Sequence, residues 1–193
     1  MLRGARGRTA IAKRTLHQQP YFTNNAAICF TGQGSQYPGM GLDVYKNNNV
    51  ARRIIDEADA ALGFKISDIM FNKNATKLTT TSIAQPAILL HSIMMLEVVK
   101  NAYKCKNVKD AGYEIALGHS LGEYTALVAT EAITLSEGIQ LVHKRGLAME
   151  RAMESNVDTN ENQYGMYALM PTTYEHAFDL CETINGDSDS GAI

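Results

Sequence analysis

Ser120 is the residue of this sequence whose type and surroundings are best suited to chemistry. It lies at the centre of Gly118-His-Ser-Leu-Gly122, after an apolar run and before a segment with helical periodicity. The pattern therefore predicts a strand, a sharp turn and a helix. A serine at such a turn is lifted clear of the backbone, and a glycine two residues to either side removes Cβ atoms that would clash. We interpret Ser120 as a nucleophile.

The helix predicted after Ser120 would also serve acyl transfer. Its first backbone amides have no partner within the helix and carry the positive end of the helix dipole. A negative oxygen formed by attack of the serine would therefore be stabilised where it arises. Gly-x-Ser-x-Gly also occurs by chance, and it is the position between a strand and a helix that favours the catalytic interpretation.

A glycine-rich segment follows the first apolar run of the chain. Ala26-Ala-Ile-Cys-Phe-Thr31 is typical of a buried strand, and Gly32-Gln-Gly-Ser-Gln36 comes directly after it. Backbone amides in such a loop can face inward without obstruction by side chains. The segment lacks the lysine of a phosphate-binding P-loop, so taken alone it indicates only a turn.

Hydrophobic periodicity places several other elements. Apolar residues recur every four positions over 50–62 and predict a helix that ends at Gly63. The following stretch, 64–74, has the pattern of a connection. Near the end of the chain, 164–170 is a candidate strand and 174–184 a candidate helix.

Two capping boxes predict where long helices begin. Ser82 and Gln85, followed by a proline, place the start of one helix within 83–86. Thr134 and Glu137 form the second box and open another helix. We expect both helices to present apolar faces to a core.

Arg145 lies on the second of these helices, on a stripe that it shares with Leu141 and Met149. An arginine beside a buried face needs an anion. Periodicity alone favours the ordinary outcome, in which the side chain extends to water or pairs with Glu150 or another carboxylate.

The charge of the chain is distributed unevenly. Residues 1–42 contain no acidic residue and five basic ones, which are Arg3, Arg6, Arg8, Lys13 and Arg14. The net charge is -2, so removal of the first 25 residues would leave -2 - 5 = -7. An acid-free leader rich in arginine is typical of a mitochondrial transit peptide, and a basic tail without a targeting role is the alternative.

Composition excludes several other classes. No window approaches the ~20 apolar residues that a membrane span needs, and the basic residues after the leader do not cluster with aromatic ones as in nucleic-acid binding. Cys29, Cys105 and Cys181 are widely spaced and offer neither a disulfide framework nor a metal-binding pattern. This cysteine usage suits a reducing compartment.

Taken together, five motifs resemble the malonyl-CoA:acyl carrier protein transacylase family in order and spacing over residues 26–170. They are Gly32-Gln-Gly-Ser-Gln36, Gln85-Pro-Ala87, Gly118-His-Ser-Leu-Gly-Glu-Tyr124, Arg145-Gly146 and Gly165-Met166. With the leader, the resemblance is to the mitochondrial form that serves type II fatty acid synthesis.

The resemblance implies an α/β fold with a mostly parallel sheet, flanking helices and a nucleophile elbow, joined to a ferredoxin-like small subdomain. We expect a transit peptide over 1–25, the N-terminal part of the acyltransferase domain over 26–160, and the start of the subdomain over 161–193. The implied location is the mitochondrial matrix.

The resemblance also implies a role for each matching residue. Ser120 would take the malonyl group from malonyl-CoA and pass it to the phosphopantetheine thiol of acyl carrier protein, with no other cofactor bound. The backbone amides of Gln33 and Leu121 would form the oxyanion hole. Arg145 would bind the malonyl carboxylate through paired hydrogen bonds, and His119 would help to shape the site.

Two departures from the family affect these expectations. Thr31 stands where the family has proline, which should change the rigidity of the loop but spare its amides. The chain is also shorter than the family, whose general-base histidine lies in the second half. The histidines of this chain are His17, His91, His119, His143 and His176, and none of them lies in the family's general-base motif. We therefore expect a fragment or truncated form of an active enzyme.

Two alternatives remain open at this point. A serine esterase of the α/β-hydrolase type would use the same elbow, but it needs an Asp and a His later in the chain and has no use for Arg145. A truncated, non-catalytic relative would bind acyl carrier protein without transferring an acyl group. Formation of a malonyl adduct on Ser120 separates the transacylase from this non-catalytic relative.

Overall fold

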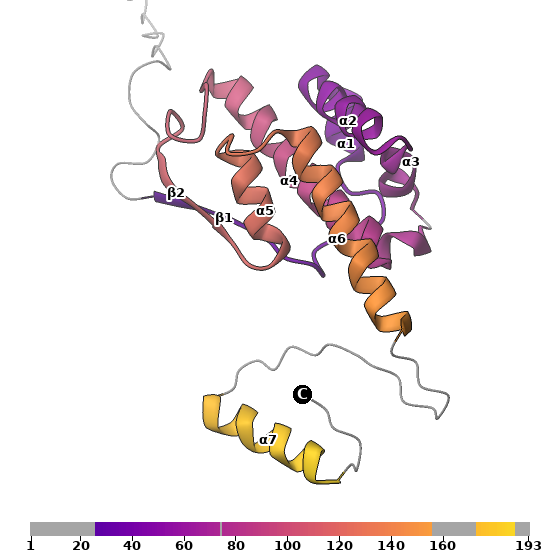
Figure 1. Ribbon diagram of the computed structural model, residues 1–193. Coiled ribbons are helices and arrows are strands. Elements are labelled where there is room, and N and C mark those ends of the chain that lie inside the picture. Colours follow the sequence, from indigo (N-terminus) through magenta and orange to yellow (C-terminus); the bar gives the residue numbers. More distant parts are fainter. Residues whose placement is uncertain (1–25, 74, 156–172, 188–193) are drawn as a thin grey trace, which may run out of the picture. The chain divides into compact units, whose positions relative to one another are not determined.

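The structure is a computed structural model that describes residues 26–73, 75–155 and 173–187 (Figure 1). The chain divides into two compact units, Met1–Arg151 and Ala152–Ile193. In the first unit, two parallel strands are combined with helices. The elements in chain order are β1 (Ala26–Phe30), α1 (Leu42–Asn47), α2 (Asn49–Leu62), α3 (Ile66–Phe71), a 3-10 turn (Thr76–Thr79), α4 (Thr81–Tyr103), β2 (Tyr113–Gly118), α5 (Leu121–Ala129), α6 (Leu135–Ser155) and α7 (Tyr174–Asp187).

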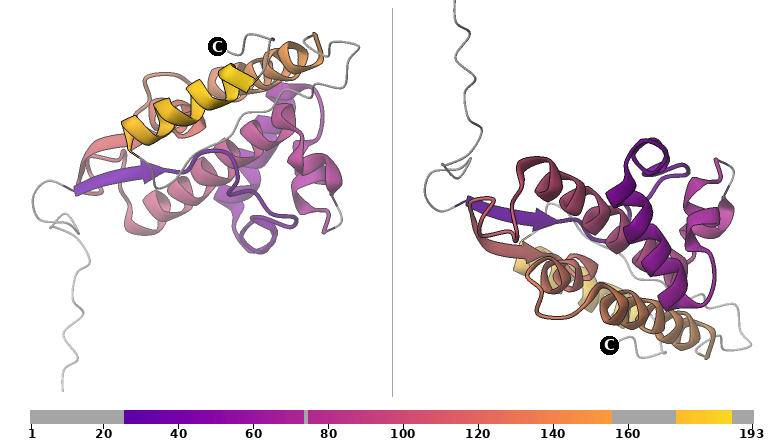
Figure 2. Two further views of the ribbon diagram at one scale, coloured as in Figure 1. Left: turned by 90° about the horizontal axis from the view of Figure 1, so that it is seen from below. Right: turned by 90° about the horizontal axis from the view of Figure 1, so that it is seen from above.

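The two strands bring the ends of distant segments together. β1 and β2 pair in parallel, with Phe30 opposite Gly118 at the carboxyl end of both. Helix α5 packs against both strands and against α4, and α2 packs on α4, as the two views of Figure 2 show. The carboxyl ends of parallel strands are where ligands bind in α/β sheets. The parallel pairing of the strands and the helices packed on them confirm the predicted α/β fold.

The strand predicted at the start of the domain is present but less buried than expected. Along β1 the side chains alternate, with Phe30 buried and Ala27 and Cys29 exposed. On β2 the exposed apolar side chains are Ile115 and Leu117. Within the described part of the first unit, then, helices cover one face of the two-stranded sheet, and the opposite face exposes apolar side chains.

Helix α4 forms the centre of the core. By length and by a mean hydropathy of 1.5 it is apolar enough to cross a membrane, so the expectation that no segment approaches a span was too strong. However, 61% of that window is buried inside the protein. Its buried residues include Ile88, Leu89, Leu90 and Met94, which is the behaviour of a core helix.

The predicted capping box at the start of α4 is wrong. The helix begins at Thr81, so Ser82 and Gln85 lie inside it and are both buried, and Pro86 also lies within the helix. Polar atoms of Ser82 and Gln85 contact α6 instead of capping α4. A local pattern could not reveal this, because the competing partners are about 60 residues away in the sequence.

The helix ending at Gly63 is confirmed, and a short helix was missed. Asn48 caps α2 by accepting hydrogen bonds from the Val50 and Ala51 amides. The stretch predicted as a connection contains α3, whose second residue, Ser67, donates its amide and hydroxyl to the Asp59 carboxylate. Since this partner comes from α2, tertiary contact stabilises α3.

The second capping box is confirmed at the start of α6. The Thr134 amide and hydroxyl both donate to Glu137 Oε2, at 2.9 and 2.8 Å, and the Glu137 amide donates to the Thr134 hydroxyl at 3.2 Å. These bonds, first from the backbone amide and then from the hydroxyl, hold the pKa of Glu137 below its ordinary value.

In the second unit the structure describes one helix. Helix α7 confirms the helix predicted over 174–184 and continues to Asp187. The strand predicted over 164–170, on which the ferredoxin-like subdomain depends, lies outside the described residues. That subdomain and the 160/161 boundary therefore stay predictions.

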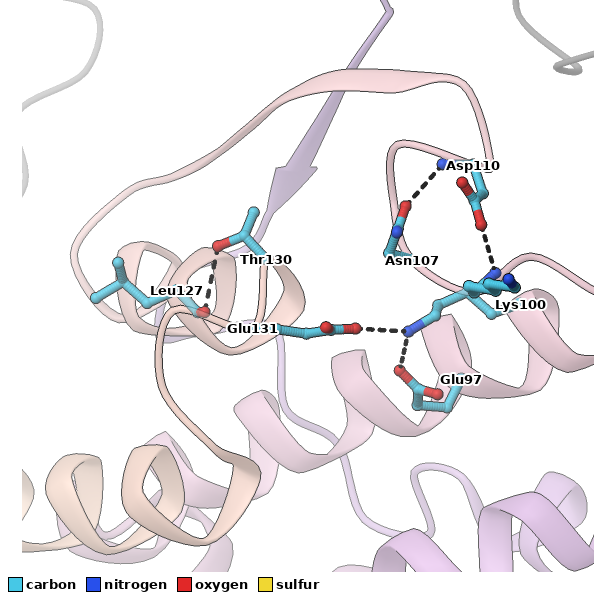
Figure 3. A network of polar contacts seen from close by, with 8 residues as sticks. Glu97, Lys100, Asn107, Asp110, Leu127, Thr130 and Glu131 are labelled. Atoms are coloured by element: carbon cyan, nitrogen blue, oxygen red, sulfur yellow. Dashed lines mark hydrogen bonds and ion pairs between the residues drawn. The ribbon is translucent and has the colours of Figure 1, made fainter.

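A buried lysine on α4 forms an ion pair with the turn after α5, as Figure 3 shows. Lys100 Nζ lies 2.7 Å from a Glu97 carboxylate oxygen and 3.7 Å from one of Glu131. Glu131 has the left-handed backbone conformation, with φ of 62°. Because the lysine side chain is 7% exposed, loss of either carboxylate would leave its charge partly unpaired.

Candidate active site

Ser120 has the backbone conformation of a nucleophile on a sharp turn. Strand β2 ends at Gly118, α5 begins at Leu121, and Ser120 between them has φ of 53° and ψ of -105°. A non-glycine residue with positive φ is strained and persists only when its surroundings impose it. The residue is exposed, so its hydroxyl is accessible.

Two glycines make this turn possible. A Cβ on Gly118 would lie 2.2 Å from the Gly122 carbonyl carbon, and one on Gly122 would lie 2.3 Å from the Phe30 carbonyl oxygen. Both obstacles are backbone atoms, which cannot rotate away. The need for glycine within the bend is as predicted, and the structure adds that the first turn of α5 packs directly on the end of β1.

The first turn of α5 leaves one amide available. The Gly122 amide donates to the His119 carbonyl at 2.9 Å, and the Glu123 amide to the Ser120 carbonyl at 3.3 Å. Among the described residues, no acceptor is recorded for the Leu121 amide. An unpaired donor next to Ser120 is what an oxyanion hole requires, although the role itself stays a prediction.

The glycine-rich loop after β1 lies against the elbow. A Cβ on Gly32 would lie 3.1 Å from the His119 carbonyl oxygen and 3.7 Å from His119 Nδ1. Gln33, the residue predicted to supply the second oxyanion amide, is anchored through its side chain, whose Nε2 donates to Thr81 Oγ1 at 3.3 Å. The structure thus brings both predicted oxyanion segments to the same end of the sheet.

Thr31 contributes to this loop in a way that proline could not. Ser35 Oγ donates to the Gly32 carbonyl at 3.2 Å, so the Thr31 hydroxyl supplies the proton in its 3.0 Å contact with Ser35 Oγ. Hydrogen bonds of the side chains therefore bridge the loop between Thr31 and Ser35.

Arg145 reaches the Ser120 hydroxyl. Its Nη2 donates to Ser120 Oγ at 3.1 Å, its Nη1 donates to Gln85 Oε1 at 2.8 Å, and its guanidinium carbon lies 5.6 Å from the centre of the Tyr124 ring. The ordinary outcome that periodicity favoured, extension to water or a pair with Glu150, is wrong. Glu150 Oε1 instead accepts from the Ser82 amide at 2.6 Å.

Gln85 is a residue whose place in the site the capping argument missed. It is fully buried, and besides accepting from Arg145 its Nε2 donates to Met149 Sδ at 3.3 Å. The sequence did contain a signal, since a polar amide in an otherwise apolar helix needs a buried partner. Which partner it has depends on how α4 and α6 cross.

No described histidine is recorded in contact with Ser120 Oγ. His119 is exposed beside it, His143 contacts the Ser82 carbonyl, and His91 lies edge-on to Tyr37. Burial lowers the pKa of His91 below its ordinary value, with Asp43 acting in the opposite direction. His91 is thus at the edge of the core, where it packs against Tyr37.

The fold and this geometry define an α/β protein that carries an exposed serine on a strand–turn–helix elbow, with a guanidinium beside the hydroxyl. The chain belongs to the acyl transferase domain family, whose match covers residues 28–170. It is similar to the malonyl CoA-acyl carrier protein transacylase of Staphylococcus aureus, with 34% identity over 164 residues, 85% of this chain and 48% of that protein. With the same-named protein of Bacillus subtilis it shares 42% identity over 129 residues, 66% and 38% of the two chains.

Solved structures show the same likeness. The acyl-carrier-protein-S-malonyltransferase of Bartonella henselae superposes with a TM-score of 0.70 at 32% identity, over 84% of this chain and 49% of that one. A malonyl-transacylase solved in complex with a type II polyketide synthase acyl-carrier protein gives a TM-score of 0.58 at 33% identity, over 65% of this chain and 39% of that one. The chain spans about half the length of the curated relatives it matches.

Proposed function

We propose that this protein takes part in malonyl transfer from malonyl-CoA to acyl carrier protein through an ester on Ser120. The observation that carries the proposal is the contact between Arg145 Nη2 and Ser120 Oγ, at 3.1 Å. A guanidinium at this distance can bind the free carboxylate of a malonyl group while the thioester end reaches the serine. An acyl group without a carboxylate would have no use for it.

Each half of the reaction exchanges one acyl bond for another. Ser120 Oγ attacks the thioester carbonyl, a new C–O bond forms, and the C–S bond breaks to release coenzyme A, which leaves with the serine proton. The phosphopantetheine thiol of acyl carrier protein then attacks the ester, and Ser120 regains its proton. The Leu121 and Gln33 amides would stabilise the oxyanion in both halves.

The proton must be moved by a group other than Arg145, because a guanidinium is a donor only. In the family this base is a histidine from the half of the domain with which this chain does not align. His119 is expected to shape the site, in keeping with its place against Gly32. The reaction needs no resident cofactor, since acyl carrier protein brings the phosphopantetheine.

Arg145 would also determine which acyl group is accepted. Its charge is held by Gln85 and Tyr124 in a half-buried position. An acyl group that fills the site without supplying an anion leaves this charge unpaired, which costs roughly several kcal/mol. Acetyl-CoA supplies no carboxylate, whereas malonyl-CoA does. Selection of malonyl over acetyl follows.

We place the protein in the mitochondrial matrix, in type II fatty acid synthesis, on the composition of residues 1–25. The acid-free, arginine-rich leader supports this location. Fusion of residues 1–25 to a fluorescent reporter tests it: we expect mitochondrial fluorescence, and a diffuse signal would contradict the proposal.

The adduct itself tests the proposed activity. The chain, and any longer form of the protein that contains it, is incubated with malonyl-CoA, and intact mass is measured. We expect a malonyl increment that Ser120→Ala abolishes and that Ser136→Ala, a serine on α6, retains. A folded longer form that gains no increment would rule out the enzyme.

That negative result would favour the second candidate, a non-catalytic protein that binds acyl carrier protein. The solved complex of a malonyl-transacylase with its acyl-carrier protein supports recognition of this partner. An esterase is disfavoured, because Arg145 beside the hydroxyl serves an anionic acyl group rather than a neutral one.

A further inference from the structure

Pro86 removes one hydrogen bond from the backbone of α4. In an α-helix each amide donates to the carbonyl four residues earlier, which for position 86 is the carbonyl of Ser82. Proline has no amide hydrogen, so Ser82 receives no bond from Pro86. Because Ser82 is only 5% exposed, an unpaired carbonyl at this position would be costly.

A side chain from α6 takes the place of the missing amide. His143 Nδ1 lies 2.8 Å from the Ser82 carbonyl oxygen. A carbonyl oxygen can only accept, so Nδ1 carries the imidazole proton and donates it. The ring is half-buried and lies against Phe64, with ring centres 5.4 Å apart, which limits its rotation.

Two more residues on α6 hold the same residue of α4. Glu150 accepts from the Ser82 amide at 2.6 Å, and a Cβ on Gly146 would lie 2.4 Å from Ser82 Cα, so the two backbones touch. Positions 143, 146 and 150 are spaced by three and four, and therefore lie on one face of α6. Both backbone polar groups of Ser82 are thus bound by this helix.

The contacts of His143, Gly146 and Glu150 with Ser82 are called the clamp from here on. The clamp sets the register of α4 and α6, the two helices that carry Gln85 and Arg145. Gln85, three residues further along α4, accepts from Arg145, two residues after His143 on α6. A shift of α6 along α4 would break both the clamp and the Gln85 contact. We infer that His143 is a positioning residue: it replaces the hydrogen bond that Pro86 removes and so holds Arg145 within reach of Ser120.

The tautomer of His143 is the first test, and it is measured on the native chain. Nitrogen-15 NMR of the full chain distinguishes a protonated Nδ1 from a protonated Nε2 in a neutral imidazole. Loss of one resonance in His143→Asn assigns the signal. We expect the Nδ1–H form. The Nε2–H form would overturn the proposal.

A double-mutant cycle with Pro86 then isolates the bond. In the native background, His143→Ala should lower the equilibrium constant for folding by about tenfold, because a buried carbonyl loses its donor. In Pro86→Ala, where the helix amide is restored, the loss should be less than about threefold. His143→Asn, which keeps a donor, should recover most of the stability. Equal losses in both backgrounds would contradict the proposed bond.

The position of Arg145 is measured separately. Its guanidinium N–H resonances should be resolved in the native chain and in His143→Asn, because Gln85 and Ser120 restrict rotation. In His143→Ala they should broaden or merge, and unchanged resonances would refute the positioning role. The consequence for malonyl selection rests on the proposed function, whereas these measurements require no acyl transfer. A failed adduct experiment therefore leaves the test of the clamp intact.

Discussion

Replacement of Arg145 by alanine is expected to lower the ratio of malonylation to acetylation at Ser120 by about 100-fold or more. The carboxylate would lose two charge-assisted hydrogen bonds, each contributing roughly 1.5–3 kcal/mol, whereas acetyl never made them. The measurement is the rate at which intact mass increases with malonyl-CoA and with acetyl-CoA. It is made on the form of the protein that acquires the adduct.

Lys144→Ala provides a matched control for this experiment. Lys144 is the neighbour of Arg145 on α6, is exposed, and carries the same charge. Its removal should leave the ratio within about threefold of the native value, because an exposed charge contributes little. Arg145→Lys should recover only part of the ratio, because an ammonium cannot form paired bonds with a carboxylate as a planar guanidinium does. An unchanged ratio in Arg145→Ala would show that the carboxylate binds elsewhere.

Gly146→Ala is expected to destabilise the first unit by about 2 kcal/mol, which is the upper end of the typical overpacking cost less the gain in helix propensity. The added Cβ would lie 2.4 Å from Ser82 Cα, 2.8 Å from the Ser82 nitrogen and 2.9 Å from the Thr81 carbonyl oxygen. All three are backbone atoms, so α6 must move away from α4, and overpacking of this kind costs ~1–3 kcal/mol or more. Urea unfolding followed by circular dichroism gives the free energy of unfolding.

Gly138→Ala on the same helix separates this clash from the effect of alanine itself. Its Cβ would lie 2.4 Å from Val128 Cγ2, a side-chain atom that can shift. Both substitutions gain ~1 kcal/mol of helix propensity, so the difference between them reports the backbone contact alone. We expect Gly138→Ala to stay within about 1 kcal/mol of the native protein. Equal stabilities of the two variants would refute the close approach of α4 and α6 at Ser82.

Local chemistry made some features predictable. The elbow follows from two glycines around Ser120, because the backbone obstacles to a Cβ come from the turn itself and from the adjacent strand. The capping box of Thr134 and Glu137 is complete within four residues, and its three hydrogen bonds form as expected. Gly63 ends α2 in the left-handed conformation that glycine favours.

The same reasoning failed where a distant residue competed for a local group. Ser82 and Gln85 have the spacing of a capping box, yet Glu150, His143 and Arg145 bind their polar groups. Helix α3 is too short to show periodicity, and its cap comes from Asp59 on another helix. Periodicity placed Arg145 beside a buried face but could not show that it would reach Ser120.

By itself, the sequence determined the strand, turn and helix around Ser120, the main helices and the family, because glycine spacing, capping and apolar periodicity act over a few residues. Only the tertiary structure decided that Arg145 faces Ser120 and that Gln85 and His143 serve it. These contacts depend on how α4 and α6 cross, and the backbone contact at Gly146 allows that crossing. Such a crossing is the sum of many packing contacts between distant residues, which no short segment contains.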